Sequence, residues 1–326
     1  MEKIQTQPNR AKNGAWLILL LSVIVAAATA WIPAGLLLAP AFWAYAGARG
    51  KPAWIALPAL VYGALALMLY NTEAALGLFV SATAAAFALY YMQTRRVSNA
   101  YTALTLAGLF LAGLYCAVCL PGILSGAGAF AGSQAAMDEM ISFYRTAAAQ
   151  ISGISAEYLD FINTYLDAFS EAVPSFIVAA LCVGAGVLGL GNLLFFRLFC
   201  RRRKEIAISP MREFRYWTMP RSMMLGLFAL LIGSLVLEWT GWTFSDGMSS
   251  TVNVLVAMPL LLQGLCVIDF FLARARRSAA TARVVSYVLI GLLFGLVQTP
   301  LILLGCLEQI VRIRERTQNM PPKPAL

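Results

Sequence analysis

The stretch from Thr251 to Arg277 constrains this chain most strongly. It reads TVNVLVAMPLLLQGLCVIDFFLARARR. Its apolar run of about twenty residues is long enough to cross the ~30 Å hydrocarbon core of a bilayer as a helix. A carboxylate such as Asp269 costs about 2.5–3.5 kcal/mol at mid-bilayer, so it needs a partner or water. The arginines at the end of the stretch predict that this end faces the cytoplasm.

Similar apolar blocks fill most of the sequence. The chain has 326 residues, of which 60% are hydrophobic and 12% are charged, whereas soluble domains carry about 25% charged residues. We therefore predict an all-α polytopic transmembrane helical bundle with about 8–10 membrane segments. A helical extracytoplasmic cap is expected to cover one end.

The basic residues lie in short clusters beside the apolar blocks. The net charge of +9 therefore reflects the positive-inside pattern and contact with membrane lipids, not binding of nucleic acid. We expect a multi-pass protein of the bacterial cytoplasmic (inner) membrane with a cytoplasmic N-terminus. Because apolar character continues past AAATA at 26–30, the first run is expected to be an uncleaved span.

The chain contains no histidine and six cysteines. Without histidine, Ser-His-Asp catalysis and histidine metal sites are excluded. The cysteines lie in or at the ends of apolar segments, where cysteine usually acts as a small hydrophobic residue. HExxH and GxSxG patterns are also missing from the sequence. We expect no catalytic residue, no metal, no cofactor and no enzymatic activity.

The organisation is predicted in three regions. Residues 1–124 form N-terminal transmembrane helices, beginning with a hairpin at 15–47 that two prolines interrupt. Residues 125–173 carry six acidic residues against one arginine and amphipathic periodicity, which predicts an extracytoplasmic helical insertion. Residues 174–326 form C-terminal transmembrane helices with a basic cytoplasmic tail.

The last apolar block, 283–313, has two possible structures. Pro300 lies near its middle, and proline disturbs the helix ladder. A tight hairpin at Pro300 would leave the basic tail in the cytoplasm, whereas a single span would place it outside, against the charge rule.

Several residues suggest helix contacts. Gly184 opens a literal GxGxxG at 184–189, but no soluble βαβ unit surrounds it, so close helix packing is the expected role. Gly291 and Gly295 form a GxxxG pattern with the same expected role. Glu308 and Arg312 are four residues apart, which predicts an ion pair on one helix face.

Four polar residues within the spans are candidates for substrate binding: Gln263, Asp269, Gln298 and Asn192. Under the structural interpretation, the charged groups of the spans pair with arginines and hold helix ends together. Under the functional interpretation, a polar cavity among the C-terminal helices binds a small solute or ion. Gln263 and Asp269 are six residues apart, so they lie on different faces of one helix.

Three motifs suggest a family. They are Arg212-Glu-Phe-Arg-Tyr-Trp-Thr-Met-Pro220 before a span, Leu262-Gln-Gly-Leu-Cys-Val-Ile-Asp-Phe-Phe-Leu272 before basic residues, and Gly305-Cys-Leu-Glu-Gln309 before Arg312 and Arg314. The chain resembles the YybS-like family of bacterial membrane proteins, DUF2232. This resemblance implies a fold similar to the substrate-binding S components of energy-coupling-factor transporters. The chain is longer than those components, and the acidic insertion at 125–173 departs from them.

Two functions follow as expectations. One is a transporter-like, S-component-like protein that binds a small solute, for which fold analogy is the main support. The other is a non-transporting scaffold or assembly factor, which holds other membrane or cytoplasmic proteins through the linker at 205–219 and the basic tail.

Overall fold

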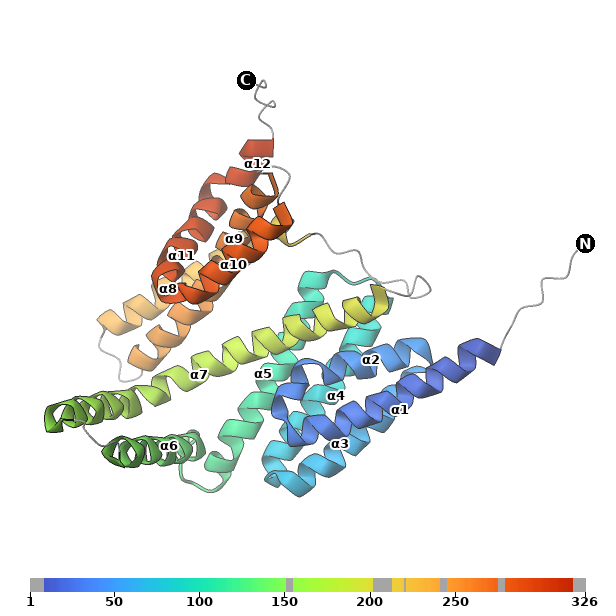
Figure 1. The fold of residues 1–326 in the computed structure, drawn as a ribbon, viewed down its shortest axis with the longest axis horizontal. Helices are drawn as coiled ribbons and strands as arrows, with labels where there is room; N and C mark the ends of the chain where they lie inside the picture. The colour runs from blue at the N-terminus through green and yellow to red at the C-terminus, as the bar shows by residue number, and fades with distance from the viewer. Residues whose placement is uncertain are drawn as a thin grey trace, which may run out of the picture. The chain divides into compact units, whose positions relative to one another are not determined.

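The computed structural model describes residues 9–150, 155–201, 213–219, 221–240, 245–274 and 279–318. These residues form helices without any strand, which confirms the all-α class (Figure 1). The chain divides into two compact units, Met1–Pro210 and Met211–Leu326. The predicted basic clusters at 202–204 and 276–277 lie outside the described residues.

Among the described residues, seven helices are long and apolar enough to cross a membrane. Two shorter apolar helices, Trp16–Trp31 and Arg283–Leu292, accompany them. This count agrees with the predicted polytopic bundle. The seven are Pro52–Leu69, Thr72–Thr94, Asn99–Leu124, Phe176–Arg201, Ser222–Trp239, Thr251–Arg274 and Phe294–Val311.

The first unit contains seven α-helices and two 3-10 helices in its described part. They are α1 (Asn9–Trp31), η1 (Pro33–Leu37), α2 (Ala39–Arg49), η2 (Pro52–Ile55), α3 (Ala56–Leu69), α4 (Thr72–Thr94), α5 (Asn99–Leu124), α6 (Ala131–Gln150) and α7 (Ala156–Arg201). Alanines fill much of the core between α1, α2, α3 and α4, and Trp43 packs on Tyr62 with ring centroids 5.7 Å apart. Small side chains let membrane helices approach closely.

The predicted hairpin at 15–47 is present as α1, η1 and α2, with its turn at Ile32–Leu38. Helix α2 has 11 residues, or roughly 16 Å, and cannot cross the bilayer alone. Irregular backbone at membrane depth must find hydrogen-bond partners inside the protein. The turn therefore raises the question of which groups satisfy its free amides and carbonyls.

Asn192 of α7 supplies those partners. Its Oδ1 accepts a hydrogen bond from the backbone N–H of Ala41 at 2.8 Å, and its Nδ2 donates to the carbonyls of Leu36 and Leu188, each at 2.9 Å. The side chain is fully buried. Asn192 thus caps the first turn of α2 from a distant helix, in place of the local cap that Leu38 does not provide.

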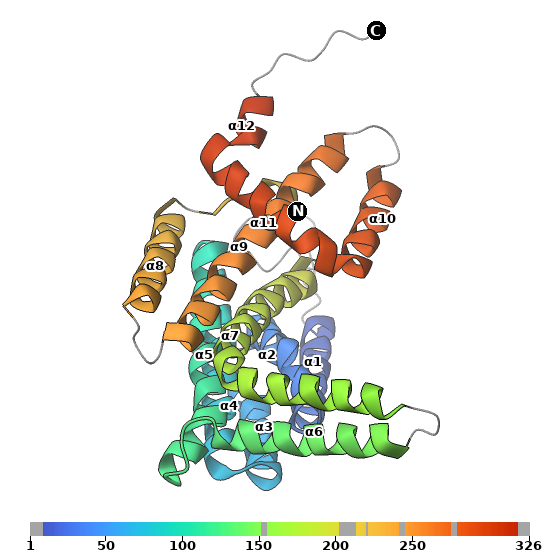
Figure 2. The same ribbon diagram turned by 90° about the vertical axis from the view of Figure 1, so that its left-hand side faces the viewer.

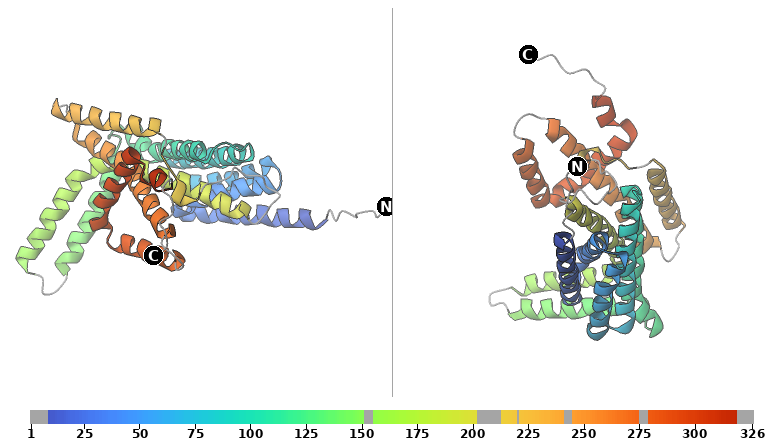
Figure 3. Two further views of the ribbon diagram at one scale, coloured as in Figure 1. Left: turned by 90° about the horizontal axis from the view of Figure 1, so that it is seen from above. Right: turned by 90° about the vertical axis from the view of Figure 1, so that its right-hand side faces the viewer.

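Helix α7 is a single element of 46 residues. It is far longer than the roughly 20 residues that cross a hydrocarbon core, and its first and second halves run in different directions (Figure 2). The helix runs through the predicted boundary between 173 and 174, and its candidate membrane span begins just after that boundary, at Phe176. Its second half packs against α5 at Gly189, and its first half pairs with α6 through Asp167 and Ser170. Figures 2 and 3 show this pair lying across the direction of α4 and α5.

The second unit contains η3 (Phe214–Tyr216), α8 (Arg221–Trp239), α9 (Ser245–Arg274), α10 (Ala279–Leu292), α11 (Phe294–Val311) and α12 (Ile313–Gln318). The last apolar block is broken, but at Leu293 and not at Pro300, which lies inside α11. The guanidinium of Arg274 donates to the carbonyl of Thr317 at 3.0 Å. The ends of α9 and α12 therefore lie side by side, as the hairpin alternative requires.

Candidate functional site

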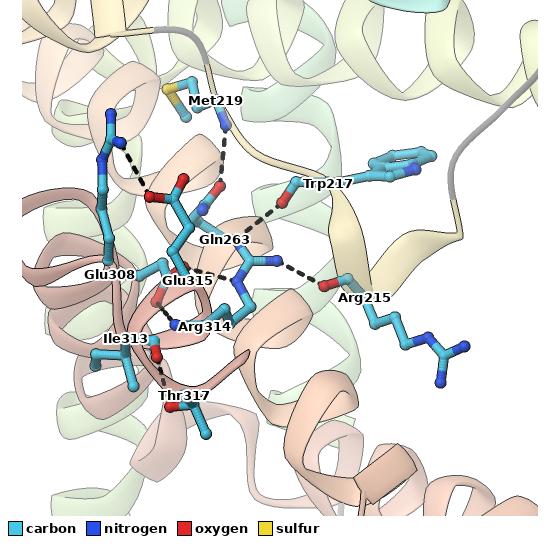
Figure 4. A network of polar contacts seen from close by, with 10 residues as sticks. Arg215, Trp217, Met219, Gln263, Glu308, Ile313, Arg314, Glu315 and Thr317 are labelled. Carbon is cyan, nitrogen blue, oxygen red and sulfur yellow. Dashed lines mark hydrogen bonds and ion pairs between the residues drawn. The ribbon is translucent and has the colours of Figure 1, made fainter. Parts of the chain in front are cut away.

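A network of polar contacts occupies the end of the second unit where α9, α11 and α12 meet the linker at 213–219 (Figure 4). The linker carries η3 and packs on α9. The network includes three of the residues singled out in the sequence, Gln263, Glu308 and Arg312. Its organising residue is Arg314, which the sequence did not single out as a site.

The left-handed backbone conformation of Arg312 places Arg314 in this network. Arg312 has φ 52° and ψ 55°, and its N–H donates to the Glu308 carbonyl at 2.9 Å. Such a conformation ends α11, and α12 begins at Ile313. In an unbroken helix, Arg314 would lie about 240° around the axis from Glu308. The reversal at Arg312 brings the two side chains together instead.

Arg314 and Glu308 form a buried ion pair. The Arg314 Nε lies 2.7 Å from Glu308 Oε1, and the side chains are 5% and 4% exposed. The backbone N–H of Arg314 also donates to Glu308 Oε2 at 3.3 Å. A buried charge of this kind is tolerated only when it is paired and its remaining hydrogen-bonding groups are satisfied.

The other nitrogens of Arg314 hold the linker. Nη1 donates to the carbonyl of Arg215 at 2.6 Å, and Nη2 donates to the carbonyl of Trp217 at 3.1 Å. The planar guanidinium fork is suited to such simultaneous contacts. One buried side chain therefore fixes two carbonyls of a segment about one hundred residues earlier in the chain.

Aromatic and amide contacts complete the attachment of the linker. Phe214 packs edge-on against Trp217 at 5.4 Å, and Tyr216 packs on Phe270 of α9 at 6.3 Å. The N–H of Met219 donates to Gln263 Oε1 at 3.3 Å. Gln263 is thus a positioning residue for the linker.

The exposed side of this assembly is basic and aromatic. Arg215 pairs with Glu213 and stacks over the ring of Tyr216 at 4.9 Å. Arg274 and Arg316 are exposed nearby, and Arg312 pairs with Glu315 at 2.9 Å. We call residues 213–219, Arg274 and residues 312–317 the linker platform. Its chemistry suits recognition of an acidic surface.

The four predicted substrate-binding residues do not converge. Asn192 lies in the first unit and is used as a cap. Asp269 is 7% exposed and pairs with Arg283 Nε of α10 at 2.9 Å, as the structural interpretation predicted. Gln263 holds Met219, and Gln298 is exposed on α11.

The predicted pair of Glu308 with Arg312 is wrong. Glu308 pairs with Arg314, and Arg312 pairs with Glu315. The physical reason is the end of α11 at Val311, because a spacing of four residues brings side chains together only within a continuous helix.

The predicted packing glycines are also corrected. A Cβ built on Gly291 or Gly295 would meet no atom within 4 Å, and one on Gly184 would meet only Leu114 at 3.9 Å. The close approaches occur at other glycines. A Cβ on Gly264 of α9 would overlap the Leu301 carbonyl oxygen, and one on Gly305 of α11 would overlap that of Leu260.

The 184–189 motif does pack closely, but through its last glycine. A Cβ on Gly189 would lie 2.7 Å from the backbone nitrogen of Ala107. In addition, α4 and α5 meet at Gly77 and Gly113. The glycine patterns correctly predicted that helices pack closely at glycines, but they did not identify which glycines. The spacing of glycines in the sequence does not show which face of a helix contacts its neighbour.

A second polar cluster lies in the first unit. The Gln93 side chain is fully buried and donates through Nε2 to Thr102 Oγ1 at 3.0 Å. Arg197 Nη1 donates to Asn99 Oδ1 at 2.9 Å and to Gln93 Oε1 at 3.3 Å. The cluster ties α7 to the turn between α4 and α5. Sequence reasoning missed Gln93 and Thr102, which carry no charge or motif.

An open groove of about 680 Å³ lies beside this end of α4. Its lining is mainly apolar, with Phe87, Tyr90 and Tyr91 beside Pro52 and with Arg95 at its edge. The guanidinium of Arg95 lies over the Tyr91 ring at 4.3 Å. Such a wall suits hydrocarbon contact better than a polar solute.

The described residues contain no cluster of three or more potential metal ligands. The buried carboxylates Glu308 and Asp269 each face an arginine. The arrangement can hold segments of chain in fixed positions, and it presents no carboxylate pair of the kind used for acid–base chemistry.

The seven long apolar helices in the described part of the chain define a polytopic helical membrane protein. The family model DUF2232, described as a predicted membrane protein, matches residues 16–307. The chain belongs to this family. Comparison with curated proteins and with solved structures finds no match.

Proposed function

We propose that this chain is a non-transporting scaffold of the bacterial cytoplasmic membrane that binds an acidic protein surface through its linker platform. The observation that carries the proposal is the buried Arg314, which pairs with Glu308 and fixes the carbonyls of Arg215 and Trp217. A rigid basic and aromatic surface is thereby built from segments that are distant in sequence. Preorganised surfaces lose less entropy on binding.

The proposed orientation of the protein in the membrane follows the positive-inside rule. In the second unit, Arg274 at the end of α9 lies beside α12 with its basic residues. In the first unit, the guanidinium of Arg197 donates to Asn99 at the start of α5, and the turn between α4 and α5 carries Arg95 and Arg96. Arginine-rich ends belong on the cytoplasmic side. The platform would then face the cytoplasm, where soluble and membrane partners can both reach it.

Solute binding, the other function expected from the sequence, needs polar groups that converge on one cavity. Asn192 and Gln263 are engaged with backbone groups, Asp269 with Arg283, and Gln298 lies on the surface. These contacts favour the scaffold. A transporter-like role would be supported by a solute that raises the melting temperature of the purified chain and loses this effect with Gln263→Leu or Asp269→Asn.

The proposal is tested by affinity purification from gently solubilised membranes. Arg215→Glu reverses one charge of the platform and should remove a stoichiometric partner. Arg314→Met combined with Glu308→Leu changes no exposed charge and leaves no unpaired buried charge, but it releases the linker and should weaken the same partner. Lys51→Glu, an equal charge reversal on an exposed residue of the first unit, is the control.

Retention of the partner by Arg215→Glu and by the double variant Arg314→Met with Glu308→Leu would refute the scaffold role of the platform. Equal loss with all three variants would show that bulk charge, and not the platform, governs capture.

A further inference from the structure

The paired helices α6 and α7 carry a second surface that the proposed function does not use. We call residues 131–150 and 156–170 the hairpin. Its large apolar side chains are exposed: Phe143, Phe161 and Tyr165 have 68%, 65% and 66% of their surface accessible. Contiguous exposed apolar surface usually marks a binding site for a protein or a membrane.

The sequence of α7 repeats a three-residue pattern in this region. Tyr158-Leu159-Asp160, Phe161-Ile162-Asn163 and Tyr165-Leu166-Asp167 each run from aromatic to aliphatic to polar. The central aliphatic residues are half-buried, whereas the aromatic and polar residues on either side are exposed. Since the triplets recur every three or four residues, each class forms a stripe along the helix.

Helix α6 shows the same order around its buried residue. Met140 precedes Ile141, which is 5% exposed, and Ser142 follows it. One step back along a helix is a rotation of about 100°. In a pair of antiparallel helices, the residue just before an inward-facing residue points to the same face of the pair on both helices. The aromatic stripe of α7 and the Met140 position of α6 therefore share one face of the hairpin.

The contacts between the helices confirm that polar groups occupy the other face. Arg145 of α6 pairs with Asp167 of α7, and Ser170 donates to Asp138 at 3.1 Å. Asp160 and Asn163 lie on this side as well, because each directly follows a half-buried aliphatic residue that faces α6. The hairpin is thus a two-helix plate with one aromatic face and one acidic, ion-paired face.

The hairpin also lies across the spans. Figure 2 shows α6 and the first half of α7 running crosswise to α4 and α5, and Figure 3 shows the same from the opposite side. It is attached at the ends of α5 and of the α7 span that are opposite Arg95 and Arg201. A plate that runs crosswise to membrane-crossing helices, and is joined to their ends, extends along the membrane surface.

We propose that the hairpin is a membrane-interface plate whose aromatic face is buried at the headgroup–acyl boundary of the leaflet opposite the basic ends. Phe and Tyr suit this depth, about 5–10 Å into the boundary, because their rings are apolar and the tyrosine hydroxyl can reach water. The acidic face points into water. The two spans to which the hairpin is joined, α5 and the second half of α7, hold the plate to the bilayer, so binding does not depend on basic residues or anionic lipids.

The test is a depth measurement on the full chain in lipid nanodiscs. Spin labels are placed by Phe161→Cys and Tyr165→Cys on the aromatic stripe, and by Asp160→Cys and Asn163→Cys on the polar stripe. The unsubstituted chain gives the background from the native cysteines. Accessibility to oxygen, which concentrates in lipid, is compared with accessibility to a water-soluble nickel complex.

The proposal predicts an oxygen-to-nickel ratio several-fold higher at 161 and 165 than at 160 and 163. The difference should persist in nanodiscs made only of zwitterionic lipid. Equal access to nickel at all four positions would overturn the proposal. Protection of 161 and 165 from both probes would overturn it too, since it would indicate a protein neighbour in place of lipid.

Discussion

Removing the charge of Glu308 tests whether the buried pair governs the stability of the second unit. Glu308→Gln keeps the shape of the side chain but leaves the Arg314 guanidinium, 5% exposed, without its counter-charge. Breaking a buried ion pair in this way costs about 3–5 kcal/mol. Because the volume is conserved, no cavity contributes to that loss.

The matched control is Glu315→Gln. Glu315 pairs with Arg312, but its side chain is 58% exposed, and exposed pairs contribute about 0–1 kcal/mol. The two substitutions are chemically identical and lie seven positions apart, so their difference isolates burial. Unfolding of the detergent-solubilised protein, followed by denaturant titration, measures both.

Replacing both charges separates stability from positioning. Glu308→Leu combined with Arg314→Met leaves no unpaired buried charge, so it should be less destabilising than Glu308→Gln. The carbonyls of Arg215 and Trp217 nevertheless lose their donor, and trypsin should cleave faster after Arg215. The reasoning is refuted if Glu308→Gln is no more destabilising than Glu315→Gln.

Three further tests address other parts of the fold. Asn192→Leu should destabilise by about 1–3 kcal/mol for each buried backbone group that it leaves without a partner, measured by thermal unfolding. Gly264→Ala should cost at least about 1–3 kcal/mol through overpacking against backbone, whereas Gly291→Ala, which meets no atom within 4 Å, should not destabilise; equal effects would contradict the helix contact. Arg312→Gly should be tolerated because glycine accepts positive φ, whereas Arg312→Val should destabilise, and the reverse order would show that the left-handed turn is not required.

The class of the fold could be predicted because it depends on sums over many residues. Apolar runs of about twenty residues with arginines at their ends indicate membrane helices whatever their neighbours are. The break in the first block was also predictable, since prolines mark it. The break in the last block was expected at Pro300, but proline at that position stays within α11 and the chain turns at Leu293.

The partners of individual polar residues could not be predicted. Asn192 caps a helix about 150 residues earlier, and only the packing of α7 on η1 reveals this. Glu308 was expected to pair with Arg312 because the spacing of four assumes a helix that continues. The left-handed conformation of Arg312 is visible only in the backbone, since arginine carries no preference for it.

The Asn192 cap also has a consequence for how the protein is made. The backbone groups at Leu36 and Ala41 emerge early, yet their hydrogen-bond partner is 156 and 151 residues further along the chain. The opening hairpin therefore enters the lipid before the segment that completes it has been synthesised. Water, lipid headgroups or an insertion factor must satisfy those groups until α7 arrives, so the N-terminal region is stable only after most of the polypeptide has left the ribosome.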